Sequence, residues 1–260
     1  PECYSEMVDN SRLDKFSEAT LLLSVAAFLT EDNVYANKAE SLINTWFVNP
    51  ITRQTPHFRF AQVIPGQDEL RYQGLVEARR LIYVCDAINL LYQLNEISLN
   101  DYEQCKSWFR KLLEWIEKSE QGQRARDAKN NIGFWTDLQR LVYASFCGNN
   151  ELADRVVGES VIPRLNSQID EGGKLLNELK RANPFDYVAF TLLAMAGLSA
   201  ANRHGEIQLA EYSTDEGKNF QNAFNWFIET IHANDLQEKG FALAQLDRKS
   251  TRLNSSHTQK

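Results

Sequence analysis

The feature that most constrains this chain is a helical spacing of apolar residues that continues through nearly its whole length. Apolar residues three or four positions apart lie on one face of an α-helix. Ser98, with Asp101 three positions later, predicts a capped helix N-terminus. An apolar stripe then follows at Tyr102, Cys105, Phe109, Leu112 and Ile116. Similar stripes run through about 12–30, 34–48, 73–95, 131–147, 150–169, 186–203 and 217–233.

Strand patterns are short, and the run at Val63-Ile64 is followed at once by Pro65-Gly66. The sequence therefore predicts an all-α fold. Short polar turns join consecutive helices, which predicts antiparallel hairpins stacked as an open solenoid or closed into an α/α toroid. The chain has no fixed repeat period, which counts against a regular solenoid. Two long polar loops, at about 49–72 and 170–185, are of the kind that often carries function.

Residues 1–246 are predicted to form one domain, since no linker interrupts them. Residues 247–260 lack apolar periodicity and resemble a translated sequencing adapter, so we interpret them as an artefactual tail. The first residue is Pro1 rather than Met, and we therefore expect the natural N-terminus, with any export signal, to be missing.

Charge and composition exclude several classes of partner. Without the tail the chain has 24 basic and 34 acidic residues, a net charge of −10, which argues against nucleic acid. An acidic polymer would need a locally basic cleft. Nothing runs for 18 apolar residues, so no membrane-spanning helix is expected. The histidines and cysteines lack the spacing of a metal site, and we predict neither metal nor cofactor.

Three segments in a fixed order carry the functional signal. They are TWFVNPITR at 45–53 with FAQ at 60–62 and IPG at 64–66, KNNIGFWTD at 129–137, and NELKR at 177–181 with Tyr187. In order and spacing they resemble the alginate lyase family (polysaccharide lyase family five and relatives), and the match covers most of residues 10–235. The resemblance implies an α/α toroid, an incomplete barrel of antiparallel helical hairpins. It also implies a secreted or periplasmic lyase whose partner is an acidic polysaccharide, alginate or a glucuronan-like polyuronate.

Lyases of this kind cut the chain by β-elimination, in which the C5 proton leaves and the bond to the 4-linked oxygen breaks. The site must neutralise the neighbouring carboxylate and supply a base and an acid. The resemblance implies that Asn131 neutralises the carboxylate through its amide. It implies that Arg181 stabilises charge and lowers the pKa of a tyrosine, and that Tyr187 is the base, the acid or both. Predicted substrate-binding residues are Arg59, Gln62, Arg79, Trp135 and His57.

Each of these residues also has a purely structural interpretation. An Asn at a helix start is often a cap. Tyr187 lies on an apolar face with Phe190, as a core aromatic would. Arg181 alone would be a solvated charge, and Trp135 is a natural packing residue.

The sequence departs from the family pattern at one decisive position, where Ile132 replaces the histidine that follows the paired Asn. Losing one such electrostatic group typically costs about a hundred- to a thousandfold in rate. Thr136 and Asp186 also replace a frequent Tyr and a frequent His, and His57 in the long loop could substitute for the lost histidine. Three alternatives stay open: a glycan-binding pseudoenzyme, a hydrolase using Asp137 and Asp186, and a helical scaffold without sugar chemistry.

Overall fold

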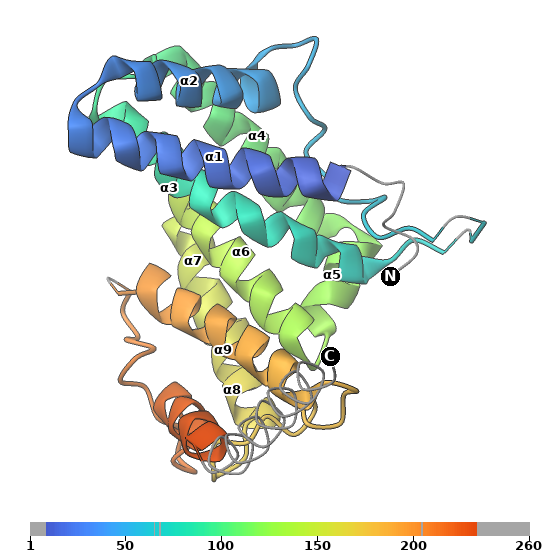
Figure 1. The fold of residues 1–260 in the computed structure, drawn as a ribbon. Helices are drawn as coiled ribbons and strands as arrows, with labels where there is room; N and C mark the ends of the chain where they lie inside the picture. The colour runs from blue at the N-terminus through green and yellow to red at the C-terminus, as the bar shows by residue number, and fades with distance from the viewer. Residues whose placement is uncertain (1–8, 65, 68, 204, 233–260) are drawn as a thin grey trace, which may run out of the picture.

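The computed structural model describes residues 9–64, 66–67, 69–203 and 205–232, and this part of the chain is almost entirely helical (Figure 1). The α-helices are α1 (Asp9–Thr30), α2 (Asn33–Ile43), α3 (Leu81–Gln93), α4 (Leu99–Lys118), α5 (Glu120–Asp127), α6 (Asn131–Cys147), α7 (Asn150–Val156), α8 (Ile162–Gln168) and α9 (Pro184–Ala201). Shorter π- or 3-10 helices are η2 (Asn44–Val48), η3 (Tyr72–Arg80) and η4 (Val157–Val161). Residues 220–232 are also helical.

The all-α prediction is confirmed, since the described residues contain no strand beyond an isolated bridge between Ile169 and Leu175. The two long loops of the structure lie close to their predicted positions, at about 49–72 and 170–185. The helix α5 was not predicted, because EQGQRARD is polar on all sides and shows no apolar stripe. The tail at 247–260 lies outside the described residues.

Local sequence explains where the helices begin and end. The Ser98 hydroxyl accepts the Asp101 N–H at 3.1 Å, as predicted, and so caps α4. Asn130 caps α6 by accepting the Ile132 N–H at 3.0 Å. Gly148 ends α6 with a φ of 76°, in the left-handed region that glycine adopts without strain.

The helices stack as hairpins (Figure 1). Helices α1 and α2 pair at one end, α3 lies against α1, and α9 packs along α6 at the other end. One hydrophobic core runs through this stack. Helix α6 is buried along most of its length, and its fully buried Tyr143 donates its hydroxyl hydrogen bond to the Ala78 carbonyl of η3 at 2.6 Å. Helix α6 therefore fixes η3 and α9. Of the predicted catalytic residues, Asn131 begins α6, Tyr187 lies in the first turn of α9 and Arg181 lies in the loop before it.

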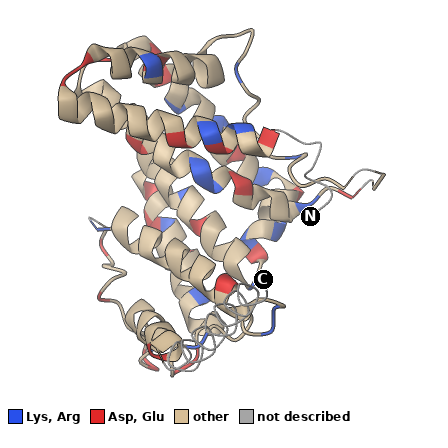
Figure 2. Cartoon of the chain, viewed as in Figure 1, with Lys and Arg blue, Asp and Glu red and all other residues tan. Residues whose placement is uncertain are grey.

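Helix α9 has Asp186 as its one charged residue, and Figure 2 shows its ribbon as almost entirely tan, the colour of uncharged residues. By length and composition alone it is the one described helix that could cross a membrane, a property shared by core helices of water-soluble proteins. The expectation of no such helix rested on an uninterrupted apolar run, whereas α9 reaches the required hydropathy on average. Here one side of α9 packs on α6.

Candidate active site

The turn that leads into α6 is held in place by a buried arginine. Arg164 donates to the carbonyls of Ala128 at 2.5 Å and Arg126 at 2.7 Å, and its Nε donates to the Asp137 carboxylate at 2.7 Å. A Cβ on Gly133 would lie 2.0 Å from the Arg164 guanidinium nitrogen. The glycine in the NNIG segment is therefore required by this close approach, and the arginine fixes the backbone just before the predicted catalytic asparagine.

Asn131 is bound to a buried carboxylate that the sequence interpretation left without a role. Its backbone N–H donates to Glu178 Oε1, and its side-chain Nδ2 lies 3.3 Å from Oε1 and 3.2 Å from Oε2. Glu178 is only 1% exposed. The next two amides, of Ile132 and Gly133, donate to the side chain and carbonyl of Asn130. The N-terminus of α6 is thus already satisfied and is not an open anion site.

The other two predicted catalytic residues contact each other. The Arg181 guanidinium carbon lies 4.2 Å from the centroid of the Tyr187 ring. Arg181 is exposed in the loop before α9, whereas Tyr187 is half-buried in the first turn of that helix. The Arg181 N–H donates to the Glu178 carbonyl at 3.0 Å, which ties this pair to the residue that holds Asn131. The structure therefore brings Asn131, Arg181 and Tyr187 to the same end of the molecule, through Glu178.

The Glu178 carboxyl is electrostatically unusual. Burial raises its pKa above the ordinary glutamate value, while the hydrogen bonds from Asn131 and the nearby Arg181 charge act in the opposite direction. Thr191 on α9 lies close enough to act in that same lowering direction, although its hydroxyl proton is donated to the Tyr187 carbonyl. The group is a buried acceptor that faces residues of three elements. Its position inside the ELKR segment was the only sequence signal that could have drawn attention to it.

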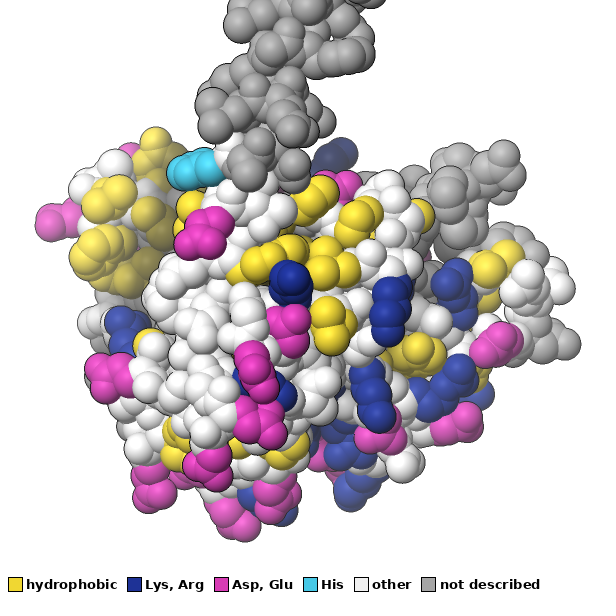
Figure 3. Space-filling view, turned by 90° about the horizontal axis from the view of Figure 1, so that it is seen from below, with side chains coloured by type: hydrophobic (Ala, Val, Ile, Leu, Met, Phe, Trp, Pro, Cys, Tyr) yellow, Lys and Arg dark blue, Asp and Glu magenta, His cyan; other side chains and the backbone are white. Residues whose placement is uncertain are grey.

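The surface around this cluster carries exposed cations. Lys129, Lys180 and Arg181 are exposed, and Asn177 donates to the Lys129 carbonyl at 2.7 Å, which places the two segments side by side. Figure 3 views the molecule from below and shows most of the Lys and Arg side chains of that face on one half of it, with Asp and Glu side chains interspersed among them. Asp186 is an exposed acid on α9. A polyanion approaching this end would meet a locally basic surface on a chain that is acidic as a whole.

Two predicted substrate-binding residues belong to the packed interior. Trp135 is 5% exposed and donates its ring N–H to the Phe190 carbonyl at 3.1 Å. Arg79 lies over both rings, 6.0 Å from the Trp135 centroid and 5.2 Å from that of Phe190, and pairs with Glu77 at 3.5 Å. Stacking of Trp135 on a sugar is excluded in this geometry, because α9 covers the ring. Arg79 connects η3 with α9.

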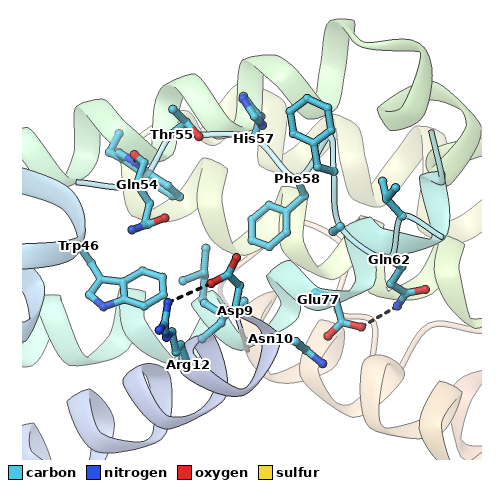
Figure 4. A pocket seen from close by; sticks show the side chains of 16 residues that line it. Asp9, Asn10, Arg12, Trp46, Gln54, Thr55, His57, Phe58, Gln62 and Glu77 are labelled. Atoms are coloured by element: carbon cyan, nitrogen blue, oxygen red, sulfur yellow. Dashed lines mark hydrogen bonds and ion pairs between the residues drawn. The ribbon is translucent and has the colours of Figure 1, made fainter. Parts of the chain in front are cut away.

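A cavity of about 570 Å³ lies on the other side of η3 (Figure 4). Its wall includes the rings of Trp46, Phe58 and Trp108, with the polar residues Gln54 and Thr55 along the loop. Aromatic walls with a few polar groups are typical of small-molecule sites. The cavity is therefore a second concave feature, separated by η3 from the basic end.

Gln62 and His57 line this cavity, whereas Asn131, Arg181 and Tyr187 do not. The Gln62 amide donates to Glu77 at 2.6 Å. The ring of His57 lies 6.2 Å from that of Trp115, and its Nδ1 is buried without a hydrogen-bond partner.

The structure places two further residues of the long loop. His57 could have replaced the missing motif histidine, but it faces this cavity rather than the Asn131 cluster, because the loop folds over α1 and η3. Arg59 is exposed, lies 5.5 Å from the Phe60 ring centroid, and is not among the residues that line the cavity.

The carboxylate pair that a hydrolase would need is not available. Asp137 is fully buried and paired with Arg164 at 2.7 Å and Arg140 at 3.5 Å. Burial raises its pKa, and the two arginines act in the opposite direction. Asp186 is exposed on α9. Because Asp137 is committed to the interior, the two cannot flank a sugar bond.

The sequence model of the alginate lyase family matches residues 5–236. The chain belongs to the alginate lyase family. Among solved structures it resembles an alginate lyase from Bacteroides ovatus, at 28% identity and a TM-score of 0.81, over 85% of this chain and 59% of that one. None of the curated proteins matches it.

Two structures of alginate lyase A1-III share the fold of this family member at lower identity. A tetrasaccharide complex has a TM-score of 0.67 at 15% identity, covering 91% of this chain and 62% of that one. The enzyme from Sphingomonas species A1 has a TM-score of 0.64 at 14% identity, covering 87% and 60%. The predicted α/α toroid is thus confirmed, and the chain spans 59% to 62% of the length of these structures.

Proposed function

We propose that this member of the alginate lyase family cleaves alginate or a related polyuronate by β-elimination. The observation that carries the proposal is the convergence of Asn131, Arg181 and Tyr187 at a basic end of the molecule. The chemistry requires a donor and a cation for the uronate carboxylate and a group that exchanges a proton. These three side chains supply them without a metal or cofactor.

In the proposed reaction the uronate carboxylate lies near Arg181 and the side-chain amide of Asn131. Their positive charge and N–H group stabilise the negative charge that grows on the carboxylate as the C5 proton leaves. The electron pair of that C–H bond forms the C4–C5 double bond, and the C4–oxygen bond breaks. Tyr187 takes the C5 proton, and the departing oxygen takes a proton from Tyr187 or from water.

We further propose that the cavity beyond η3 accommodates additional sugar units of the same polymer. Trp46 and Phe58 offer ring faces to the apolar side of a sugar, and Gln54 and Thr55 offer hydrogen bonds to its hydroxyls. A secreted or periplasmic location belongs to this proposal, because a long acidic polymer is met outside the cytoplasm. Fractionation of cells that express the gene tests the location.

A second function, that of a glycan-binding pseudoenzyme, is favoured by Ile132. This side chain is 7% exposed in the first turn of α6, next to Asn131, and it can neither donate a hydrogen bond nor carry charge. A protein that kept the basic end and lost this group would bind the polymer and leave it intact.

One assay separates these functions. The protein is incubated with alginate and with glucuronan while the ultraviolet absorbance of the unsaturated uronate is followed, and binding of the same glycans is measured by calorimetry. Absorbance that grows with the wild type and not with Tyr187→Phe supports the lyase. Binding without product supports the pseudoenzyme. Neither binding nor product on any polyuronate rejects both and leaves the helical scaffold.

A further inference from the structure

We infer that Glu178 is a positioning residue that determines which group of Asn131 faces the substrate. The catalytic part of this inference rests on the proposed function, whereas its geometric part does not. Glu178 is 1% exposed, so it does not itself touch a polymer at the surface. It would act through the asparagine.

The contacts fix the orientation of the Asn131 amide. Nδ2 lies almost equally far from the two Glu178 oxygens, 3.3 Å and 3.2 Å, so the NH₂ group of Asn131, rather than its amide oxygen, faces the carboxylate. An ionised carboxylate only accepts hydrogen bonds, and it therefore repels the flipped rotamer that would bring the Asn131 oxygen against it. In the proposed reaction the second N–H of this NH₂ group is the donor for a uronate carboxylate, which must reach it at the buried start of α6, where Asn131 is 4% exposed.

Glu178 also holds the backbone of the same residue, because Oε1 accepts the Asn131 backbone N–H. Two contacts to one residue restrict both the side-chain rotamer and the start of α6. The groups that face Glu178 come from three elements: Asn131 from α6, Arg181 from its own loop, and Thr191 from α9. The positive N-terminus of α6 favours a negative charge at this point.

A structural role explains only part of this arrangement, the acceptance of the buried Asn131 backbone N–H by Glu178. The first turn of α6 is already capped by Asn130, and Arg164 holds the turn before it. A neutral amide at this position could accept both Asn131 contacts, so what the charged carboxylate adds is discrimination against the flipped Asn131 amide. A role in orienting the Asn131 amide therefore accounts for the charged carboxylate at Glu178.

The test uses four variants of the full chain. Glu178→Gln keeps the shape but adds an NH₂ group, which can donate to the oxygen of a flipped Asn131, so that both orientations of the Asn131 amide find a partner. Glu171→Gln is the matched control, the same change at an exposed residue of the same loop. Asn131→Ala removes the positioned group, and the double variant combines it with Glu178→Gln. The readouts are kcat and KM on a polyuronate.

We expect Glu178→Gln to lower kcat about a hundredfold, the scale of a misplaced reacting group, while KM changes little. Glu171→Gln should match the wild type. The double variant should be no slower than Asn131→Ala, because Glu178 acts only through Asn131. Losses that multiply in the double variant, or a Glu178→Gln variant as fast as the wild type, overturn the inference.

A second readout does not depend on activity. In a ¹⁵N-labelled protein, the side-chain amide signals of Asn131 are identified by their absence from Asn131→Ala. We expect them to shift in Glu178→Gln and to stay in place in Glu171→Gln. Unchanged signals in Glu178→Gln overturn the inference even in an active enzyme. Shifted signals in a protein that cleaves no polyuronate support the positioning contact and reject the proposed function instead.

Discussion

The guanidinium of Arg181 lies over the ring of Tyr187, with its carbon 4.2 Å from the ring centroid. An exposed cation therefore rests on the face of a half-buried phenol, and the contact restrains the ring from one side. The backbone of Tyr187 is bound within its own helix, since the Thr191 hydroxyl donates to the Tyr187 carbonyl at 2.8 Å. In the proposed reaction this cation lies next to both the proton-transfer group and the carboxylate whose charge it balances.

The first prediction separates the hydroxyl of Tyr187 from its ring. Tyr187→Phe keeps the ring under Arg181 and removes only the group that exchanges a proton. We expect kcat on a polyuronate to fall about a thousandfold, with glycan affinity nearly unchanged. Tyr83→Phe is the control, since Tyr83 is 50% exposed on α3. Steady-state kinetics and calorimetry measure the two effects, and undiminished kcat would remove Tyr187 from the mechanism.

Most of the fold was predictable because the helices obey a single rule, the 3.6-residue spacing of apolar side chains. The prediction of 131–147 coincides with α6, and that of 150–169 covers α7, η4 and α8 as one continuous segment. The polar helix α5 does not follow this rule, because it has no apolar stripe and its start is marked only by the Ser119 cap.

The site was predictable only in part, because motifs name residues without saying which way they face. Trp135 lies in the buried part of α6, and only the packing of α9 against it shows that its ring is covered. The long loop around His57 has no periodicity, so its fold over α1 and η3 could not be derived. Glu178 was visible in the motif, but its burial against Asn131 depends on a contact 47 residues away in sequence.

The second prediction concerns stability at the base of the site. Arg164→Met leaves the buried Asp137 carboxylate without its main partner and frees two carbonyls. We expect the free energy of unfolding to fall by about 3–5 kcal/mol. Arg155→Met, at an exposed position of α7, should change it by less than about 0.5 kcal/mol. Urea unfolding followed by circular dichroism measures both, and equal effects would show that the buried arginine is not what holds the turn.

The third prediction follows from the raised pKa of Glu178. A carboxyl whose pKa is higher in the folded than in the unfolded protein binds its proton more tightly when folded. Its contribution to stability is therefore complete below the unfolded pKa and is lost as pH rises through the folded pKa. Each unit of that difference corresponds to about 1.4 kcal/mol.

Glu178→Gln cannot ionise, so the wild type should lose stability relative to this variant as pH rises from the ordinary glutamate range toward neutrality. Melting temperatures of both proteins across that range test the sign. Glu171→Gln should follow the wild type at every pH, since Glu171 is exposed. A gap that stays constant with pH, or that widens toward acid, contradicts a raised pKa at Glu178.

The last prediction restores the motif histidine. Ile132 is 7% exposed beside Asn131 in the first turn of α6, at the edge of the core. Ile132→His returns a hydrogen-bond donor to the substrate carboxylate, and we expect activity on a polyuronate to rise, or to be created, by up to about 3 kcal/mol of transition-state stabilisation. Ile132→Leu is the control for packing and should leave the activity unchanged.

Adding Tyr187→Phe to Ile132→His should abolish the gain, since phenylalanine cannot exchange a proton while the new donor remains. The comparison therefore separates a restored donor from a histidine that acts as an independent base. Should the Ile132→His protein fold, bind the glycan and release no unsaturated product, the lyase assignment of Asn131, Arg181 and Tyr187 fails. The glycan-binding function would then replace it, because the protein would still bind the polymer although restoring the histidine does not restore cleavage.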